Sequence, residues 1–379
     1  MENLKIIAKT FSGLEPILAS EVKKIGGKNV SVGRRAVFYE GNLELIYKSN
    51  YLLRTALRIL QEIHQFQFKN VDQFYLRIKR IDWTKYFSVD QSFVINSTVA
   101  NSKEFRNSMF ASLKTKDAIA DFFREKTGRR PNVDTSNPEI VINIHIFNDK
   151  CTVSLDSSGE SLHKRGYRIN QGEAPLNEVL AAAMIMLSGW NGKTDFIDPM
   201  CGSGTLPIEA AMIAQDIPPG KFRKDYACLN WKNFNQEIFA NATYFAGKKE
   251  FNNKIYASDI SATNILKAQN NARRGLVYNK IIFKTCDFKN LDIPAKNATI
   301  MINPPYGERL QINDIPGFYS MIGERLKHQF AGNTAWLLST AKENLKNIGL
   351  KASEKMELFN GPIKCSFNRY DLFSGKLKN

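Results

Sequence analysis

In the first part of the chain, short apolar runs are separated by amphipathic stretches. The runs predict strands at residues 4–8, 36–39, 93–97, 140–147 and 151–155, and Asn148-Asp149 suits a hairpin turn between the last two. Helical periodicity predicts helices at 14–25, ended by Gly26-Gly27, at 43–49, from 52 onward, and at 108–126, ended by Gly128. This mixture predicts an α+β fold for the first part.

The pattern changes after residue 172. An apolar helix is expected at 177–187, and the strands that follow it alternate with helices, at 196–197, 255–257, 281–283, 299–302 and 336–338. Such alternation predicts an α/β fold, with a parallel sheet covered by helices on both faces. Residues 156–172 are polar and contain glycines, so we expect them to link the two parts.

Composition excludes several classes of protein. The 25 Phe and 13 Tyr supply apolar surface that disordered chains lack. Apolar runs such as Ala181–Leu187 fall short of the ~18–20 residues that a bilayer span needs, so we exclude a transmembrane protein. Lys5, Lys9 and Glu15 interrupt the segment where a signal peptide would be apolar, so we expect a cytoplasmic protein. The five cysteines are scattered, without a C-x-x-C pair, which predicts reduced thiols and no metal site.

The charge points to a polyanionic partner. The chain has 53 Lys and Arg against 37 Asp and Glu, a net charge of +16, and both halves share the excess. No Lys/Arg-rich amphipathic helix with an apolar face is evident, so nucleic acid is favoured over a membrane surface. The candidate RNA contacts are Arg124, Lys126, Arg129 and Arg130, which could also be a solvated helix end, and Lys164 and Arg165 in the linker.

A glycine-rich turn suggests a nucleoside site. Within DFIDPMCGSGTLPIEAAMIA a strand leads to Asp198, then to Gly202 and Gly204, then to a helix, as in α/β folds that bind nucleotides at strand ends. Pro207 stands where a dinucleotide fold has its third glycine, so the turn is poorly built for a pyrophosphate. S-adenosylmethionine, a nucleoside without phosphates, fits better.

Two further acids follow in the expected order. Asp259 ends the second strand, where it could accept the ribose hydroxyls, and Asp287 follows the third, where it could accept the adenine amine. Asp198 and Asp259 are 61 residues apart, against the ~20 of dinucleotide folds, so residues 215–250 must be an insertion. Aromatic residues within that insertion predict that it is ordered.

Asn303-Pro304-Pro305-Tyr306 follows the fourth strand and indicates methylation of an exocyclic amine. The Asn303 side-chain oxygen and the Pro304 carbonyl could accept the amine hydrogens and direct its lone pair at the methyl group, while Tyr306 stacks on a flipped base. The alternative is a Pro-Pro turn that only closes a strand. The rival chemistry, cysteine-based transfer to a ring carbon, is disfavoured because Cys201 and Cys286 lie in the cofactor turns.

These motifs together resemble the THUMP-domain ribosomal RNA methyltransferases, specifically the bacterial family that methylates guanine N2 of 23S rRNA. The resemblance covers essentially the whole chain: LDSSGESLHKRGYR, APLNEVLAAAMIMLSGW, DPMCGSGTLPIEAAMIA, IPPGKFRKDYACLNW and NPPYGERL are similar to family segments, and the N-terminal part is more loosely similar. It implies a ferredoxin-like segment at 1–55, a THUMP RNA-binding domain at 56–156, a linker at 157–173 and a Rossmann-like class I methyltransferase domain at 174–379.

The resemblance also implies roles for individual residues. S-adenosylmethionine would be held by Asp198, Cys201, Gly202, Gly204, Thr205, Asp259, Ile260, Asp287, Phe288 and Asn303, and the guanine amine by Asn303, Pro304, Pro305 and Tyr306. The partner would be 23S rRNA or a large-subunit precursor, with no metal. Some members carry a second methyltransferase domain, whose activity we do not expect here because the chain stops at Asn379.

Two alternatives remain open. A DNA adenine-N6 methyltransferase shares the catalytic tetrapeptide, although the α+β front part and its SGESLHKRGYR link favour RNA. An RNA-binding assembly factor could use the methyltransferase part as a scaffold, but a scaffold has no need for Asp198, Asp259, Asp287 and Asn303 together. The exact nucleotide and the oligomeric state are not encoded in any motif we find.

Overall fold

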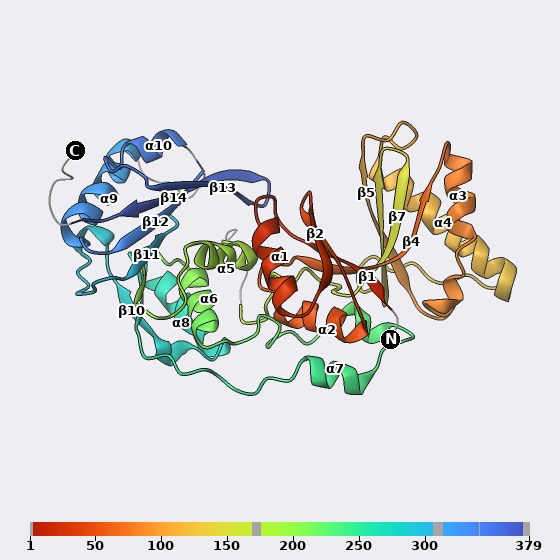
Figure 1. Ribbon diagram of the computed structural model, residues 1–379, viewed down its shortest axis with the longest axis horizontal. Helices are drawn as coiled ribbons and strands as arrows, with labels where there is room; N and C mark the ends of the chain where they lie inside the picture. The colour runs from red at the N-terminus through yellow and green to blue at the C-terminus, as the bar shows by residue number, and fades with distance from the viewer. Residues whose placement is uncertain (1–2, 169–175, 306–313, 341, 374–379) are drawn as a thin grey trace. The chain divides into compact units, whose positions relative to one another are not determined.

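The computed structural model describes residues 3–168, 176–305, 314–340 and 342–373. The chain divides into two compact units (Figure 1). The front unit comprises Met1–Thr10, Leu18–Leu162 and Arg223–Tyr244, and the rear unit comprises Phe11–Ile17, His163–Phe222 and Phe245–Asn379. No helix in the described ranges is both long and apolar enough to cross a membrane.

The front unit is built on one seven-stranded sheet. Neighbouring strands pair antiparallel except β5 and β6, which are parallel. In spatial order the strands are β2 (Lys28–Gly33), β3 (Ala36–Gly41), β1 (Leu4–Lys9), β4 (Arg58–Gln67), β7 (Lys150–Asp156), β6 (Ile140–Phe147) and β5 (Phe93–Ala100). Its helices are α1 (Glu15–Lys24), which belongs to this unit from Leu18 onward, α2 (Leu43–Leu52), α3 (Val71–Lys79) and α4 (Ser108–Thr127), with a 3-10 turn η1 (Trp83–Lys85).

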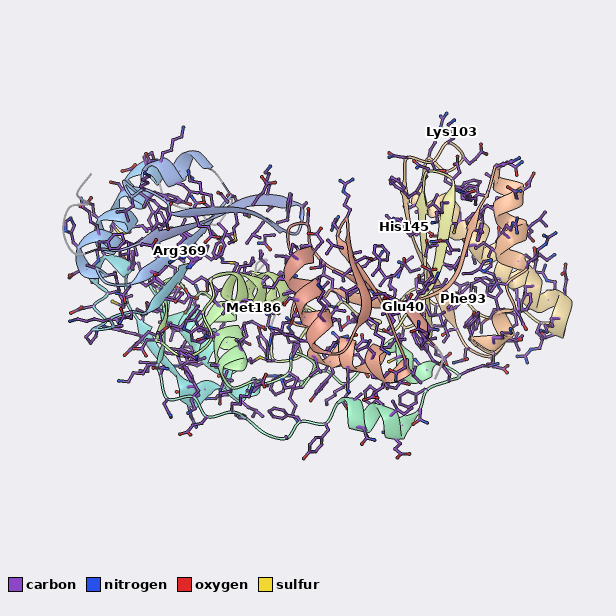
Figure 2. All side chains as sticks on the ribbon, viewed as in Figure 1. Glu40, Phe93, Lys103, His145, Met186 and Arg369 are labelled. Atoms are coloured by element: carbon purple, nitrogen blue, oxygen red, sulfur yellow. The ribbon has the colours of Figure 1, made fainter. Side chains whose placement is uncertain are left out.

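Aromatic side chains fill the core beneath α3 and α4. Phe74 and Phe105 are almost fully buried, and their ring centroids are 4.7 Å apart. Phe93, at the start of β5 (Figure 2), is fully buried against Phe87. Helix α4 ends as expected, because Gly128 adopts a left-handed φ of 74° and its N–H bonds to the Arg124 carbonyl.

One predicted element of the front unit is wrong. The helix expected from residue 52 onward is absent, because α2 ends at Leu52 and strand β4 begins at Arg58. Leu, Gln and Glu in this segment favour helices as isolated residues. In the fold, β4 bonds along both edges, to β1 and to β7, and this pairing outweighs the local preference.

Residues 223–244 lie between two stretches of the rear unit along the chain but are part of the front unit. It forms the 3-10 turn η2 (Ala227–Asn230) and helix α7 (Gln236–Ala242). Tyr226, Cys228 and Trp231 are buried in the same cluster as the sheet residues, and the Asn235 N–H donates to the Tyr47 hydroxyl at 3.2 Å. The segment is ordered, as its aromatic residues predict.

The rear unit has the expected α/β architecture. Five parallel strands and two antiparallel ones form a second seven-stranded sheet, in the order β10 (Ile281–Thr285), β9 (Ile255–Asp259), β8 (Phe196–Asp198), β11 (Thr299–Ile302), β12 (Thr334–Ser339), β14 (Ile363–Asp371) and β13 (Glu354–Asn360). The remaining elements are α5 (Glu178–Leu187), α6 (Thr205–Ala214), α8 (Ala262–Arg274), α9 (Ile315–Gln329), α10 (Lys342–Lys346), η3 (Tyr278–Lys280) and η4 (Phe288–Asn290).

Parallel strands end at one edge of a sheet, and this edge collects the polar residues that the sequence singles out. Asp198 ends β8, Asp259 ends β9, and Asn303 directly follows β11. Arg369, on the antiparallel strand β14 (Figure 2), bonds instead to Asp371 on the same strand. The candidate site is therefore formed by the loops that follow the parallel strands.

Candidate active site

The turn after β8 is held against β9 by backbone hydrogen bonds. The Cys201 N–H donates to the Ser258 carbonyl at 2.8 Å, and the Gly204 N–H donates to the Cys201 carbonyl at 2.8 Å. Gly204 has a φ of +86°, and a Cβ there would lie 2.9 Å from the Ala268 Cβ, so only glycine allows α8 to approach. Gly202 has a φ of +53° and open space where its Cβ would be.

Asp259 ties this turn to the strand beside it. Its Oδ2 accepts the Gly202 N–H at 2.9 Å, and its Oδ1 accepts the Ser261 N–H at 2.9 Å and the Asn264 amide at 3.1 Å. A carboxylate offers about four lone-pair sites, so roughly one remains for a ligand hydroxyl while Asn264 stays in place. Asp259 is only 9% exposed, so its carboxylate is largely buried within the turn.

Asp198 is the most buried of the acids in the turn. It is 1% exposed, and its Oδ1 accepts the Met200 N–H at 3.2 Å. Burial, with a smaller contribution from the nearby Asp259 charge, raises the pKa of Asp198 well above its ordinary value. A cationic group placed here would restore the ionised form, which suits a ligand that carries positive charge.

The residues after β9 and β10 differ in how they face solvent. Ile260 is 71% exposed, an unusual position for a large apolar side chain directly after a buried strand. Asp287 is partly buried, and its side chain accepts the Lys289 N–H at 2.9 Å. Phe288 is 3% exposed and stacks on Phe330 at 5.8 Å, so its ring belongs to the core. Only the backbone of Phe288 is available to a ligand.

The segment Asn303-Pro304-Pro305-Tyr306 begins with an acceptor that has no partner among the described residues. The Oδ1 of Asn303 is buried and has no hydrogen-bond partner among the described residues. Pro304 is buried beside it and Pro305 is partly exposed, while Tyr306 lies outside the described residues. Buried acceptors are nearly always paired, so this oxygen at the end of β11 is available to a donor from outside the described residues.

Two kinds of chemistry find no support in the described part of the chain. Burial, with the charges of Asp198 and Asp259, raises the pKa of Cys201 well above its usual value, so this thiol stays protonated and is a poor nucleophile. All five cysteines are unbridged. No group of three or more His, Cys, Asp or Glu in the described ranges could hold a metal ion.

The link into the rear unit places one predicted RNA contact inside the protein, which corrects our expectation. Arg165 is 1% exposed, and its Nε lies 3.5 Å from Oε1 of the buried Glu209, to which the Tyr167 hydroxyl also donates. Burying this arginine requires a carboxylate partner, so its charge serves the fold and not RNA. Lys164, one residue earlier, is exposed.

Sequence reasoning missed a second arginine in the same link. The Arg168 Nε lies 3.0 Å from Oε1 of Glu178, and its Nη2 donates to the Thr205 hydroxyl at 2.9 Å. Thr205 is the first residue of α6, directly after the glycine turn. The signal was available: Glu178 begins an otherwise apolar helix, and an acid in that position needs a cation nearby.

The four basic candidates of the front unit lie at the exposed end of α4 and the chain that follows it. Three pair with aspartates: Arg124 with Asp121 at 2.8 Å, Lys126 with Asp82 at 2.9 Å and Arg129 with Asp90 at 2.6 Å. Exposed pairs of this kind contribute about 0–1 kcal/mol, so phosphates can replace the aspartates at little cost. Arg124 and Arg130 also line a pocket of about 750 Å³, together with Lys114 and Lys116.

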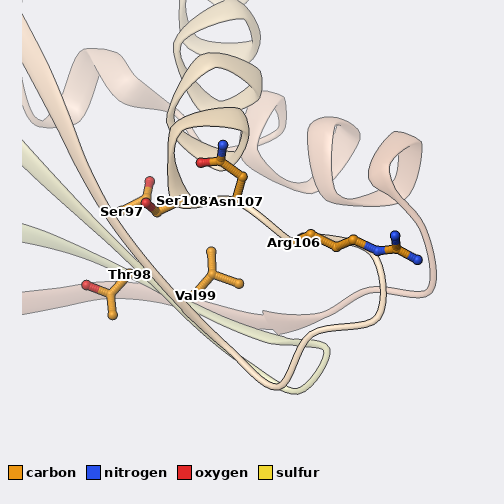
Figure 3. Close-up of a pocket in the computed structure, with 6 residues that line it drawn as sticks. All are labelled: Ser97, Thr98, Val99, Arg106, Asn107 and Ser108. Atoms are coloured by element: carbon orange, nitrogen blue, oxygen red, sulfur yellow. The ribbon is translucent and has the colours of Figure 1, made fainter.

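A second pocket of the front unit lies between β5 and the start of α4 (Figure 3). It has a volume of about 430 Å³ and is lined by Ser97, Thr98, Val99, Arg106, Asn107 and Ser108. Arg106 extends outward from this pocket in Figure 3. The front unit thus presents basic side chains at both ends of α4.

Known protein families match nearly the whole chain. Residues 165–369 match the family described as "RMKL-like, methyltransferase domain", residues 68–156 match the THUMP domain, and residues 5–60 match the "RlmL ferredoxin-like domain". These matches agree with the two sheets described above. They confirm the expected fold class, an α+β ferredoxin-like and THUMP region followed by a Rossmann-like methyltransferase domain.

Individual proteins are similar over the same length. A proposed RNA methyltransferase of Synechocystis sp., slr0064, is 36% identical over 370 residues, which are 97% of this chain and 96% of that protein. The crystal structure of SMU.472, a proposed methyltransferase complexed with SAH, is 28% identical with a TM-score of 0.88, covering 99% and 100% of the two chains. A predicted N6-adenine-specific DNA methylase from Listeria monocytogenes is 29% identical with a TM-score of 0.87, covering 98% and 97%.

Proposed function

Since the chain belongs to the RMKL-like methyltransferase family and carries that family's THUMP and ferredoxin-like domains, we propose that it methylates the N2 amine of a guanine in 23S rRNA with S-adenosylmethionine. The methyltransferase unit performs the transfer, and the front unit binds the RNA. The observation that supports this chemistry most strongly is the buried Asn303 oxygen at the end of β11, for which the described residues provide no hydrogen-bond partner.

The residues at the strand ends fit the cofactor. When bound, S-adenosylmethionine supplies an electrophilic methyl group on its sulfonium. Asp259 has an acceptor site for a ribose hydroxyl, Asp287 is placed after β10 for the adenine amine, and exposed Ile260 offers an apolar surface for the adenine ring. Gly202 leaves room over the turn, and the buried acid Asp198 favours the positive charge of the methionine part. Cys201, Gly204 and Thr205 shape the turn itself.

Asn303 and Pro304 make the guanine amine more nucleophilic. The lone pair of a guanine N2 amine is delocalised into the base, so the nitrogen is a weak nucleophile. If the Asn303 Oδ1 and the Pro304 carbonyl accept its two hydrogens, the nitrogen moves toward tetrahedral geometry and its lone pair points at the methyl group. The new N–C bond forms as the S–C bond breaks, and the amine then releases a proton to water. Pro305 stiffens the loop, and Tyr306 stacks on the flipped base.

The partner is RNA with many phosphate contacts. The THUMP match at residues 68–156 lies within the region 56–156 that we assign to RNA binding. Arg124, Lys126, Arg129 and Arg130 at the end of α4, with Lys164 in the link, are the proposed contacts. DNA is the second candidate substrate, because the similar Listeria protein is named a DNA methylase.

Single-turnover transfer of labelled methyl to protein-free 23S rRNA, followed by nucleoside analysis, tests this proposal. The label should appear on guanine N2. Asn303→Ala should transfer about 10²–10³ times more slowly, the usual cost of removing one preorganised contact to the reacting group. Its affinity for the cofactor should stay near that of the parent protein, because the Asn303 oxygen is proposed to touch the amine.

Asn303→Asp is the matched control, since it keeps an acceptor oxygen and should transfer faster than Asn303→Ala. Label on adenine N6, on a ring carbon or on DNA alone would contradict the guanine-N2 assignment. Binding of rRNA without any transfer would favour the assembly-factor alternative. An Asn303→Ala variant that transfers at the parent rate would remove Asn303 from the mechanism.

A further inference from the structure

Arg168 joins the start of α5 to the start of α6. Its Nε lies 3.0 Å from Glu178 Oε1, and its Nη2 donates to the Thr205 hydroxyl at 2.9 Å. The side chain is only 11% exposed. The guanidinium is therefore fixed beside the first residue after the glycine turn.

Two nitrogens of this guanidinium, Nε and Nη1, are buried and make no hydrogen bond to any described residue. Nε is nevertheless in an ion pair with Glu178, whereas Nη1 has neither kind of contact among the described residues. Glu178 already occupies the Nε side, so this acid does not satisfy Nη1. A buried, charged donor without an acceptor is costly, and such groups in native proteins usually mark the place of an ion, a water or a ligand.

The neighbourhood of Arg168 favours an anionic group of a bound ligand. Helix α6 begins at Thr205, and its N-cap residue Gly204 provides no side-chain acceptor for the first N–H groups. These N–H groups and the guanidinium meet at Thr205, and both favour negative charge. The open side of Gly202 lies two residues before this N-cap.

We propose that Arg168 binds the α-carboxylate of S-adenosylmethionine and so selects a cofactor that carries this group; this inference rests on the proposed function. The carboxylate accepts from Nη1 and from the start of α6. Thr205 and Glu178 act as positioning residues, because they hold the guanidinium in the orientation that the carboxylate requires. The same contacts explain why a charged residue from the link is buried next to the cofactor turn.

Calorimetric titration with two ligands tests this role. S-adenosylmethionine and its decarboxylated form differ only in the α-carboxylate, so the ratio of their dissociation constants measures that group alone. The parent protein should prefer S-adenosylmethionine by about 10- to 100-fold, the range of charge-assisted hydrogen bonds. Arg168→Gln should lose most of this preference and bind the decarboxylated ligand nearly as the parent does.

Tyr167→Phe is the matched control. It removes a neighbouring buried hydrogen bond, to Glu209, and should keep the full preference. Arg168→Lys keeps the charge without the planar fork, should fold if Arg168→Gln does not, and should show an intermediate preference. A parent-like ratio in either Arg168 variant, or an equal loss of affinity for both ligands, would overturn the proposal. A parent protein that binds neither ligand would instead contradict the proposed cofactor.

Discussion

Replacing Asp259 by alanine should weaken both the cofactor site and the fold around it. The Asp259 carboxylate accepts three hydrogen bonds from the protein, from Gly202, Ser261 and Asn264, and we assign its remaining acceptor site to a ribose hydroxyl. Alanine removes all four interactions at once. The two consequences have different sizes and can be measured separately.

Hydrogen bonds to charged groups contribute roughly 1.5–3 kcal/mol each. One such bond to the ribose corresponds to an S-adenosylmethionine affinity about 10- to 100-fold weaker in Asp259→Ala. Within the protein, the Gly202 and Ser261 N–H groups lose their acceptor, which should cost about 2–4 kcal/mol of unfolding free energy. For a unit of this size that corresponds to a melting temperature lower by about 4–16 °C.

Calorimetry gives the affinity, and thermal unfolding without ligand gives the stability. Ser261→Ala is the control: it removes the side-chain cap on the Asn264 N–H, a loss of about 1 kcal/mol, but leaves the Asp259 carboxylate intact. It should melt earlier and bind S-adenosylmethionine as the parent does. Folded Asp259→Ala with parent affinity, or Ser261→Ala with an equal loss of affinity, would refute the assignment of Asp259 to the ribose.

Three other sets of substitutions have clear expected outcomes. Because burial raises the pKa of Asp198, the ligand-free protein should lose stability as the pH rises from the ordinary carboxyl range toward that raised pKa. Asp198→Asn should therefore melt at a higher temperature than the parent at about pH 7, but not at about pH 4. Gly204→Ala should unfold several degrees earlier because its Cβ would meet Ala268, whereas Gly202→Ala should cost only the ~1–2 kcal/mol of left-handed strain yet still weaken S-adenosylmethionine binding in calorimetry. When glutamine replaces Arg124, Lys126, Arg129 and Arg130, filter-binding titrations over a salt series should give a shallower log–log slope, by about 0.7–0.9 for each phosphate that these side chains neutralise; an unchanged slope would identify the set as a solvated helix end.

The strand ends of the methyltransferase unit could be predicted because their signal is local. A short apolar run followed by an acid or by Asn-Pro-Pro places a polar side chain at the end of a buried strand, and β8, β9 and β11 confirm this pattern. The parallel arrangement then brings these ends to one edge without further information. The roles of the residues there stay predictions until they are tested.

Features that depend on distant parts of the chain could not be predicted in this way. Strand β4 forms because two neighbouring strands bond to it, and nothing within residues 58–67 shows those neighbours. In the link, Lys164 and Arg165 have the same charge and adjacent positions, yet Lys164 is exposed and Arg165 is buried against the Glu209 carboxylate, which comes from a distant part of the chain. The aromatic residues of segment 223–244 indicated order but not the unit that the segment joins.

Residues 223–244 belong to the front unit, although the chain before and after them belongs to the rear unit. This arrangement constrains the order in which the two units can fold during synthesis on the ribosome. The front unit cannot complete its core until Trp231 and the residues up to Tyr244 have been synthesised, about 80 residues after Leu162. At roughly 5–20 residues per second, this is a delay of about 4–16 s during which its apolar surface is open to chaperones. By the time Tyr244 is made, the glycine turn after β8 is present but Asp259 is not. The RNA-binding unit is therefore finished before the cofactor site can form.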